Sequence, residues 1–162
     1  VVLVGCKRKI INENNKVIMS RGKKLGNKPL ADYETVIKSI VRYGSNPIGE
    51  PGAILIRSSA IGDNKFDMSI PYFIDLDFYI KVLKNGKYYY IDENLYRFRI
   101  WSRSYSVEHK EEQYNNSKAF FNKVIDENRF VTNSDILFGK VSMYKIKIMK
   151  FFFYKIMTIL SK

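Results

Sequence analysis

Asp75 is the carboxylate in this chain best placed to act as a general base. It begins a segment, 75–83, in which apolar residues recur at helical spacing, and a helical projection puts it on the side of Phe78 and Val82. A carboxylate turned away from solvent can take the proton from an attacking hydroxyl group. The alternative is a capping role, because unpaired backbone N–H groups stabilise an acid in the first turn. The polar residues expected on the solvent face are Asp77, Lys81 and Lys84.

A second carboxylate, Glu50, stands on a rigid turn formed with Pro51 and Gly52 at the entry to a short apolar segment. Glycine at this point lets the backbone approach a ligand closely. We therefore expect Glu50, Pro51 and Gly52 to contribute to substrate binding. A plain surface turn explains the same three residues equally well.

Arg97 and Arg99 alternate with Phe98 along a segment that has the pattern of a strand. Side chains alternate between the faces of a sheet, so both guanidinium groups should lie on one face. Two such groups suit a diphosphate or a carboxylate, which makes both arginines candidates for substrate binding. A solvated sheet face is the alternative.

The composition narrows the range of functions. The chain has 162 residues, about the length of one domain, and a net charge of +12 that favours anionic partners. It lacks a Cys/His cluster, a P-loop, a Gly-x-Gly-x-x-Gly and a Gly-x-Ser-x-Gly motif, which excludes zinc modules, P-loop NTPases, dinucleotide-binding folds and common hydrolases. We assign no ligand role to His109, and we expect Cys6 to be a buried, inert thiol.

Apolar spacing and turn residues predict an α/β fold. The expected strands cover 1–6, 16–19, 53–57, 87–91 and 96–100, and the expected helices cover 30–43, 75–83, a segment from 107 onward and one from about 134 to the end. The strand at 53–57 should be buried. The core stripe expected on the helix after 107 consists of Phe120, Phe121, Val124 and Ile125. We thus expect a short mixed sheet with flanking helices over 1–106 and a helical region over 107–162.

Several stretches resemble, in this order, the acceptor-side half of a family 2 glycosyltransferase with the GT-A fold. They are Pro-Gly-Ala-Ile-Leu-Ile-Arg at 51–57, Phe-Asp at 66–67, Pro-Tyr-Phe-Ile-Asp-Leu-Asp at 71–77, Gly-Lys-Tyr-Tyr-Tyr-Ile-Asp at 86–92, and Tyr-Arg-Phe-Arg at 96–99 followed by Ser102, Ser104 and Ser106. The resemblance covers about residues 1–106. It implies a GT-A-like domain, and it places the second acid of the family's catalytic pair on Asp75.

The resemblance also implies the reaction and its participants. The parent enzyme would transfer a sugar, with inversion, from a nucleotide-sugar donor to a glycan or a lipid-linked acceptor, and it would use Mg²⁺ or Mn²⁺. The chain does not begin with Met, so we take it to be a piece of a longer protein, without the half that holds the nucleotide and the metal. We therefore expect no metal site in this chain and no catalysis by the chain alone.

Two positions depart from the family's pattern. Ile74 replaces the first acid of the catalytic pair, which leaves Asp75 without its usual neighbour. Arg99 stands where the family often has a His that helps to hold a metal or a diphosphate.

The C-terminal segment, 140–162, has lysines and small polar residues on one arc of a helical projection and Ile, Met and Phe on the other. A basic helix with a wide apolar face and no acids is typical of one lying in the headgroup layer of an anionic membrane. We therefore expect a cytoplasmic protein, peripheral on the inner face of the membrane. The alternative is a helix that docks on the domain or on a partner subunit.

A non-enzymatic basic module is the rival interpretation of the whole chain. It depends on the net charge and on the basic clusters at 7–9 and 21–24, which could bind a membrane surface or nucleic acid. Those clusters lack the interleaved aromatic residues of single-strand binders, so nucleic acid is a poor candidate.

Overall fold

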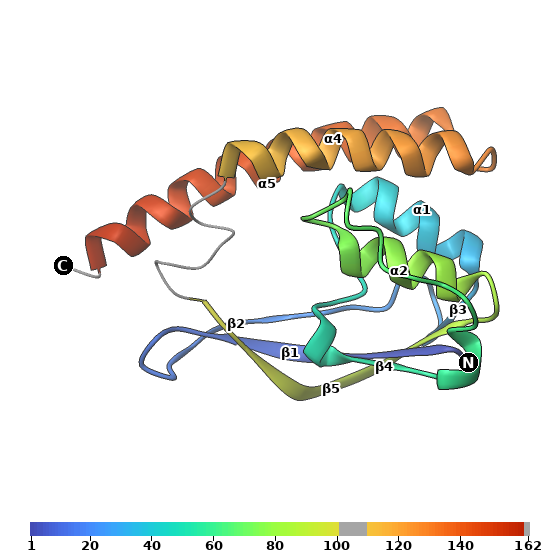
Figure 1. The fold of residues 1–162 in the computed structure, drawn as a ribbon. Helices are drawn as coiled ribbons and strands as arrows, with labels where there is room; N and C mark the ends of the chain where they lie inside the picture. The colour runs from blue at the N-terminus through green and yellow to red at the C-terminus, as the bar shows by residue number, and fades with distance from the viewer. Residues whose placement is uncertain (101–109, 161–162) are drawn as a thin grey trace.

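The computed structural model describes residues 1–100 and 110–160, with side chains described over 1–100 and 112–150. This part of the chain forms a mixed α/β fold in which helices lie over one face of a five-stranded sheet (Figure 1). The structure thus confirms the α/β class expected from the sequence.

The sheet is organised around β1 (Leu3–Ile11). One edge of β1 pairs in parallel with β5 (Tyr88–Arg99), which pairs in turn with the short antiparallel strand β3 (Leu30–Ala31). The other edge of β1 is divided between two antiparallel partners: β4 (Ile54–Ile56) at the start of β1 and β2 (Val17–Arg21) towards its end.

Strands are present where the sequence predicts them at 1–6 and 16–19, although β1 extends further, and β1 and β2 form a hairpin. Oδ1 of Asn12 accepts hydrogen bonds from the backbone N–H groups of Asn14 and Lys16, at 3.1 and 2.9 Å. Asn15 adopts a positive φ of 63°, a conformation that asparagine tolerates better than most residues. Short-range hydrogen bonds therefore close this turn.

Two strand predictions need correction. The sequence predicts separate strands at 87–91 and 96–100, whereas β5 is continuous, and an irregularity in its pairing with β1 accommodates Asp92 and Glu93. Nζ of Lys7 lies 3.3 Å from Oδ1 of Asp92, an ion pair that helps a charged segment stay in the strand. The strand expected to be buried at 53–57 is β4, where Leu55 is 74% exposed because helices cover only one face of the sheet and alternate side chains point to the other (Figure 1).

The helix predicted over 30–43 begins later, as α1 (Tyr33–Tyr43). Oδ1 of Asp32 accepts a hydrogen bond from the backbone N–H of Thr35 at 2.9 Å and so caps the helix. The helix ends at Gly44, which has the left-handed conformation typical of a C-terminal cap. The two residues ahead of the cap form β3 instead.

The core lies between the sheet and the helices α1 and α2 (Ile74–Leu83), and α4 (Lys110–Glu127) adds to it from above (Figure 1). Phe120, Phe121 and Val124 of α4 are buried, as the sequence predicts, while Ile125 is only partly buried. The helical region after residue 107 therefore shares its hydrophobic core with the sheet domain.

Helix α5 (Asn133–Leu160) packs on α1 through its N-terminal half. Its first turn is capped by reciprocal hydrogen bonds between Thr132 and Asp135, and Asp135 also forms an ion pair with Arg42 of α1 at 3.1 Å. Oγ of Ser142 donates to the backbone oxygen of Arg42 at 2.9 Å. Further along, α5 also contacts α4, because Nζ of Lys150 donates to Oε1 of Gln113, and only the C-terminal end of the helix projects away from the other elements (Figure 1).

Candidate functional site

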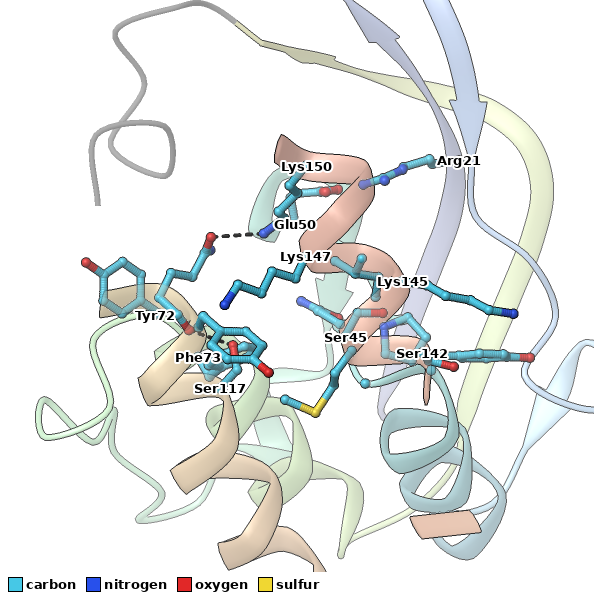
Figure 2. Close-up of a pocket in the computed structure, with 18 of the residues that line it drawn as sticks. Arg21, Ser45, Glu50, Tyr72, Phe73, Ser117, Ser142, Lys145, Lys147 and Lys150 are labelled. Carbon is cyan, nitrogen blue, oxygen red and sulfur yellow. Dashed lines mark hydrogen bonds between the residues drawn. The ribbon is translucent and has the colours of Figure 1, made fainter. Parts of the chain in front are cut away.

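A cavity of about 1110 Å³ lies between the sheet and the C-terminal helices. Residues of β1, β2, the loop after α1, the start of α2, and the helices α4 and α5 line it (Figure 2). Two of the carboxylates singled out in the sequence, Glu50 and Asp75, are among them. The fold thus brings together two candidates that are far apart in the chain.

Asp75 lies in the first turn of α2, where the residue before the helix, Phe73, offers no side-chain cap. Oδ1 of Asp75 accepts a hydrogen bond from the backbone N–H of Leu76 at 2.8 Å, and Oδ2 lies 3.4 Å from Nδ2 of Asn46. Burial raises the pKa of the Asp75 carboxyl, and the negative charge of Glu50 raises it further. One oxygen therefore caps the helix while the carboxylate also lines the cavity, so both roles considered from the sequence are compatible.

Asp77 does not lie on the solvent face as expected, because its side chain is only 7% exposed. Its Oδ2 lies 2.6 Å from Nζ of Lys81, and its Oδ1 lies 3.1 Å from Nζ of Lys123 on α4. The expected surface residue therefore joins α2 to α4, whereas Lys84 is exposed as predicted. The reason is the position of α4, which covers that side of α2.

Asn46 positions the loop that leads to Glu50. Its Oδ1 accepts hydrogen bonds from the backbone N–H groups of Ile48 and Gly49, both at 3.0 Å, and its Nδ2 donates to the backbone oxygen of Gly49 at 2.9 Å. A side chain that satisfies its own loop in this way is held in place. The same Nδ2 group is the one near Asp75, so Asn46 connects the two carboxylate-bearing segments.

Glu50 is held by an ion pair with Arg8 of β1. Nη2 of Arg8 donates to Oε1 of Glu50 at 3.2 Å, and Nε of Arg8 contacts Oε2. The arginine side chain is 5% exposed and the glutamate side chain 26%, so the pair lies at the boundary between the sheet and the cavity. Arg8 belongs to the basic cluster at 7–9, which the sequence offers as a binding surface. The structure shows that this arginine is buried and paired with Glu50.

The other members of the predicted binding turn lie elsewhere. Pro51 and Gly52 form a 3-10 turn ahead of β4, and neither residue lines the large cavity. A Cβ atom at Gly52 would lie 2.6 Å from the hydroxyl oxygen of Tyr96 on β5. The close approach that glycine permits here is therefore to the protein's own tyrosine.

Arg97 and Arg99 are exposed on β5 and do not line the cavity. Arg99 donates from Nη1 to the backbone oxygens of Asn12 and Glu13, both at 3.0 Å, and from Nη2 to Oδ1 of Asn15 at 2.7 Å. These bonds attach the end of β5 to the β1–β2 hairpin. The structure thus places Arg99 in a stabilising network and does not bring either arginine near Asp75.

Helices α4 and α5 contribute residues that the sequence reasoning did not assign to a site. Nζ of Lys150 donates to Oε1 of Gln113 at 2.9 Å, and Nζ of Lys147 lies 4.3 Å from the centre of the Tyr114 ring. Arg21 of β2 also lines the cavity. The spacing of Lys147 and Lys150 indicates a shared helix face, but nothing local indicates which part of the protein that face meets.

The metal expected for the parent enzyme has no ligand set in the described part of the chain. No group of three or more His, Cys, Asp or Glu side chains comes together there in a way that could hold a metal ion. Glu50 and Asp75 alone do not form such a site. Ser102, Ser104, Ser106 and His109 lie outside the described residues.

Comparison of the chain with family models, with curated proteins and with solved structures finds no match.

Proposed function

We propose that this chain is the acceptor-binding part of an inverting glycosyltransferase in which Asp75 is the catalytic base. The observation that supports it best is that Asp75 and Glu50 line one cavity large enough for a sugar. Asp75 belongs to the ordered motifs that resemble family 2 glycosyltransferases, and Glu50 directly precedes the first of them. The GT-A identity of the fold and the nucleotide-sugar donor are parts of this same proposal.

In the proposed reaction, Asp75 takes the proton from an acceptor hydroxyl group as its oxygen attacks the anomeric carbon of the donor. The new C–O bond forms on the face opposite the leaving group, and the nucleoside diphosphate departs with the electrons of the broken bond. A raised pKa suits this role because it makes the carboxylate a better proton acceptor. Glu50, oriented by Arg8, would accept hydrogen bonds from other hydroxyl groups of the acceptor.

The test is a transfer assay on the longest protein that carries this sequence, with a panel of nucleotide sugars and Mn²⁺. We expect Asp75→Asn to lower turnover by about 10²-fold or more, because a positioned general base contributes at least that factor. Asn retains an oxygen that can accept the Leu76 hydrogen bond, so the helix start should be preserved. The matched control is Asp126→Asn, which removes an exposed carboxylate of α4 outside the cavity. Turnover of Asp75→Asn equal to that of wild type would eliminate Asp75 as the base.

We also propose that α5 makes peripheral contact with an anionic membrane. Its described part has exposed apolar side chains at Leu137, Val141, Tyr144 and Ile148, a spacing that puts them on one stripe, and Lys140 is exposed beside it. Within the described residues, no helix has the length and apolar character needed to cross a bilayer. The docking alternative accounts for the contacts of α5 with α1, so contact with a membrane would use the outward stripe.

A further inference from the structure

We infer that the cavity contains a binding site for a phosphate-type oxyanion, formed by Arg21 of β2 together with Lys147 and Lys150 of α5. We refer to these three residues as the cationic wall. The inference depends on the balance of charge around the cavity, on the partners of each cation, and on the directions of the side chains.

The side chains that line the cavity carry an excess of positive charge. Its carboxylates are Glu50 and Asp75, while its cations are Arg8, Arg21, Lys23, Lys145, Lys147 and Lys150. Glu50 is paired with Arg8, so it does not neutralise the cationic wall. A concave surface of one sign concentrates ions of the opposite sign.

Lys150 is partly buried and has a neutral hydrogen-bond partner, Oε1 of Gln113 at 2.9 Å. Within the described side chains, neither Lys150 nor Arg21 forms an ion pair with a carboxylate. Burial lowers the pKa of Lys150, and the positive charge of Arg21 lowers it further. Arg21 is exposed, whereas the partly buried ammonium group of Lys150 has lost some of its contact with water, and an anion bound beside it would offset that loss.

The three side chains reach the same cavity from two elements, β2 and α5. Figure 2 shows Lys147 and Lys150 extending from α5 on the same side, Arg21 approaching α5 from the sheet, and Lys145 pointing away from them. The ring of Tyr114, 4.3 Å from Nζ of Lys147, holds that lysine against α4 by a cation–π contact. A guanidinium fork and two ammonium groups together match the several oxygens of a phosphate or a diphosphate.

The position of this site also indicates which class of acceptor would bind. This inference about the acceptor depends on the proposed function. A ligand that reaches both Asp75 and the cationic wall would present a hydroxyl group to the carboxylate and a phosphate group to the cations. The acceptor would then be a phosphorylated sugar or glycan. The phosphate could arrive on a free molecule or as the headgroup of a lipid-linked acceptor.

The experiment is a calorimetric titration of the full chain with pyrophosphate at constant ionic strength. We expect saturable binding that Lys150→Gln and Arg21→Gln each weaken at least about tenfold, since each removes a charge-assisted hydrogen bond to the anion. Lys150→Arg keeps the charge and should retain binding. The matched control is Lys140→Gln, which removes one exposed lysine of the same helix outside the cavity and should leave the affinity within about twofold.

A second arm uses vesicles that contain phosphatidylglycerol. Vesicle binding that pyrophosphate competes away and that Lys150→Gln removes would support a lipid headgroup as the source of the phosphate. Binding of pyrophosphate without such vesicle binding would support a free ligand. Binding of neither probe, or an equal loss in Lys140→Gln, would overturn the site. Asp75→Asn should bind pyrophosphate normally, so failure of the oxyanion site and failure of the proposed base can be told apart.

Discussion

Asp75 and Asp77 stand two positions apart on α2 and have opposite surroundings. Asp77 is buried and forms ion pairs with Lys81 and Lys123. Asp75 is partly buried near Glu50, and burial raises the pKa of its carboxyl. A carboxylate kept in a place that disfavours its charge reduces the stability of the fold, which is a common property of functional groups.

The different surroundings of Asp75 and Asp77 should give Asp75→Asn and Asp77→Asn different stabilities. At neutral pH we expect Asp77→Asn to lower the free energy of unfolding by about 1–3 kcal/mol, because it leaves two lysines without their shared carboxylate. Asp75→Asn should leave that free energy unchanged or raise it, because it removes a charge that burial disfavours. Urea denaturation of both variants measures the difference. A loss of stability in Asp75→Asn as large as that in Asp77→Asn would contradict this account of Asp75.

The free energy of unfolding should also depend on pH through Asp75. The pKa of Asp75 is raised in the folded state, so the folded protein holds the proton more tightly than the unfolded chain, whose reference value is 3.8. The contribution of Asp75 to stability is therefore fully present below that value and is lost as the pH rises through the folded pKa. The difference in free energy of unfolding between Asp75→Asn and wild type should accordingly increase as the pH rises above the unfolded value of 3.8, and it should level off above the folded pKa of Asp75.

At the scale of elements, the contact between α1 and α5 determines where the cationic wall stands. Gly139 of α5 lies against α1, and a Cβ atom there would be 2.3 Å from the backbone oxygen of Val41. Because that neighbour is backbone, it cannot move aside as a flexible side chain can. The absence of a side chain at Gly139 thus lets α5 approach α1 closely enough to hold its lysines at the cavity.

Gly139→Ala tests this contact. Alanine favours an isolated helix by about 1 kcal/mol over glycine, yet we expect the substitution to destabilise the protein because the two helices must separate. The melting temperature should fall, and pyrophosphate binding at the cationic wall should weaken. Lys140→Ala, at the next and exposed position, should leave both unchanged. An increase in stability on Gly139→Ala would show that helix propensity outweighs packing at this point.

At the scale of the whole molecule, α5 has one side docked and another exposed. The side that packs on α1 carries Met143 and Gly139, while the exposed side carries Leu137, Val141, Tyr144 and Ile148. Monomeric proteins rarely expose contiguous apolar side chains without a partner. The proposed partner is an anionic membrane. The net charge of +12 also favours attraction to negatively charged lipid headgroups.

Vesicle binding should therefore depend on the exposed stripe. We expect binding to anionic vesicles that falls as salt rises and is much weaker on neutral vesicles. Replacing Val141 and Ile148 by Gln should reduce it at least tenfold, because apolar burial contributes to insertion, without altering the melting temperature. Salt-independent binding, or full binding by the doubly substituted chain, would leave α5 as a docking helix alone. Vesicle co-sedimentation with circular dichroism measures both properties.

The sequence alone determined those features that neighbouring residues set. Helix α1 ends at residue 43 as predicted, Asn12–Asn15 forms the turn between two predicted strands, and Asp75 lies in the first turn of α2 as predicted. Each depends on hydrogen bonds or apolar spacing within a few residues, which a linear pattern records directly. The turn at 50–52 and the resemblance likewise singled out Glu50 and Asp75, respectively, from the sequence.

The tertiary structure decided the environment of each side chain. Arg8 belongs to a basic run in the sequence, but its burial beneath Glu50 follows from the position of the loop over β1. Asp77 is buried, and not exposed as expected, because α4 covers that side of α2. Lys147 and Lys150 reach the cavity because α5 docks on α1. Such outcomes depend on surfaces brought together from distant parts of the chain, and the energy of that packing is not contained in any local pattern.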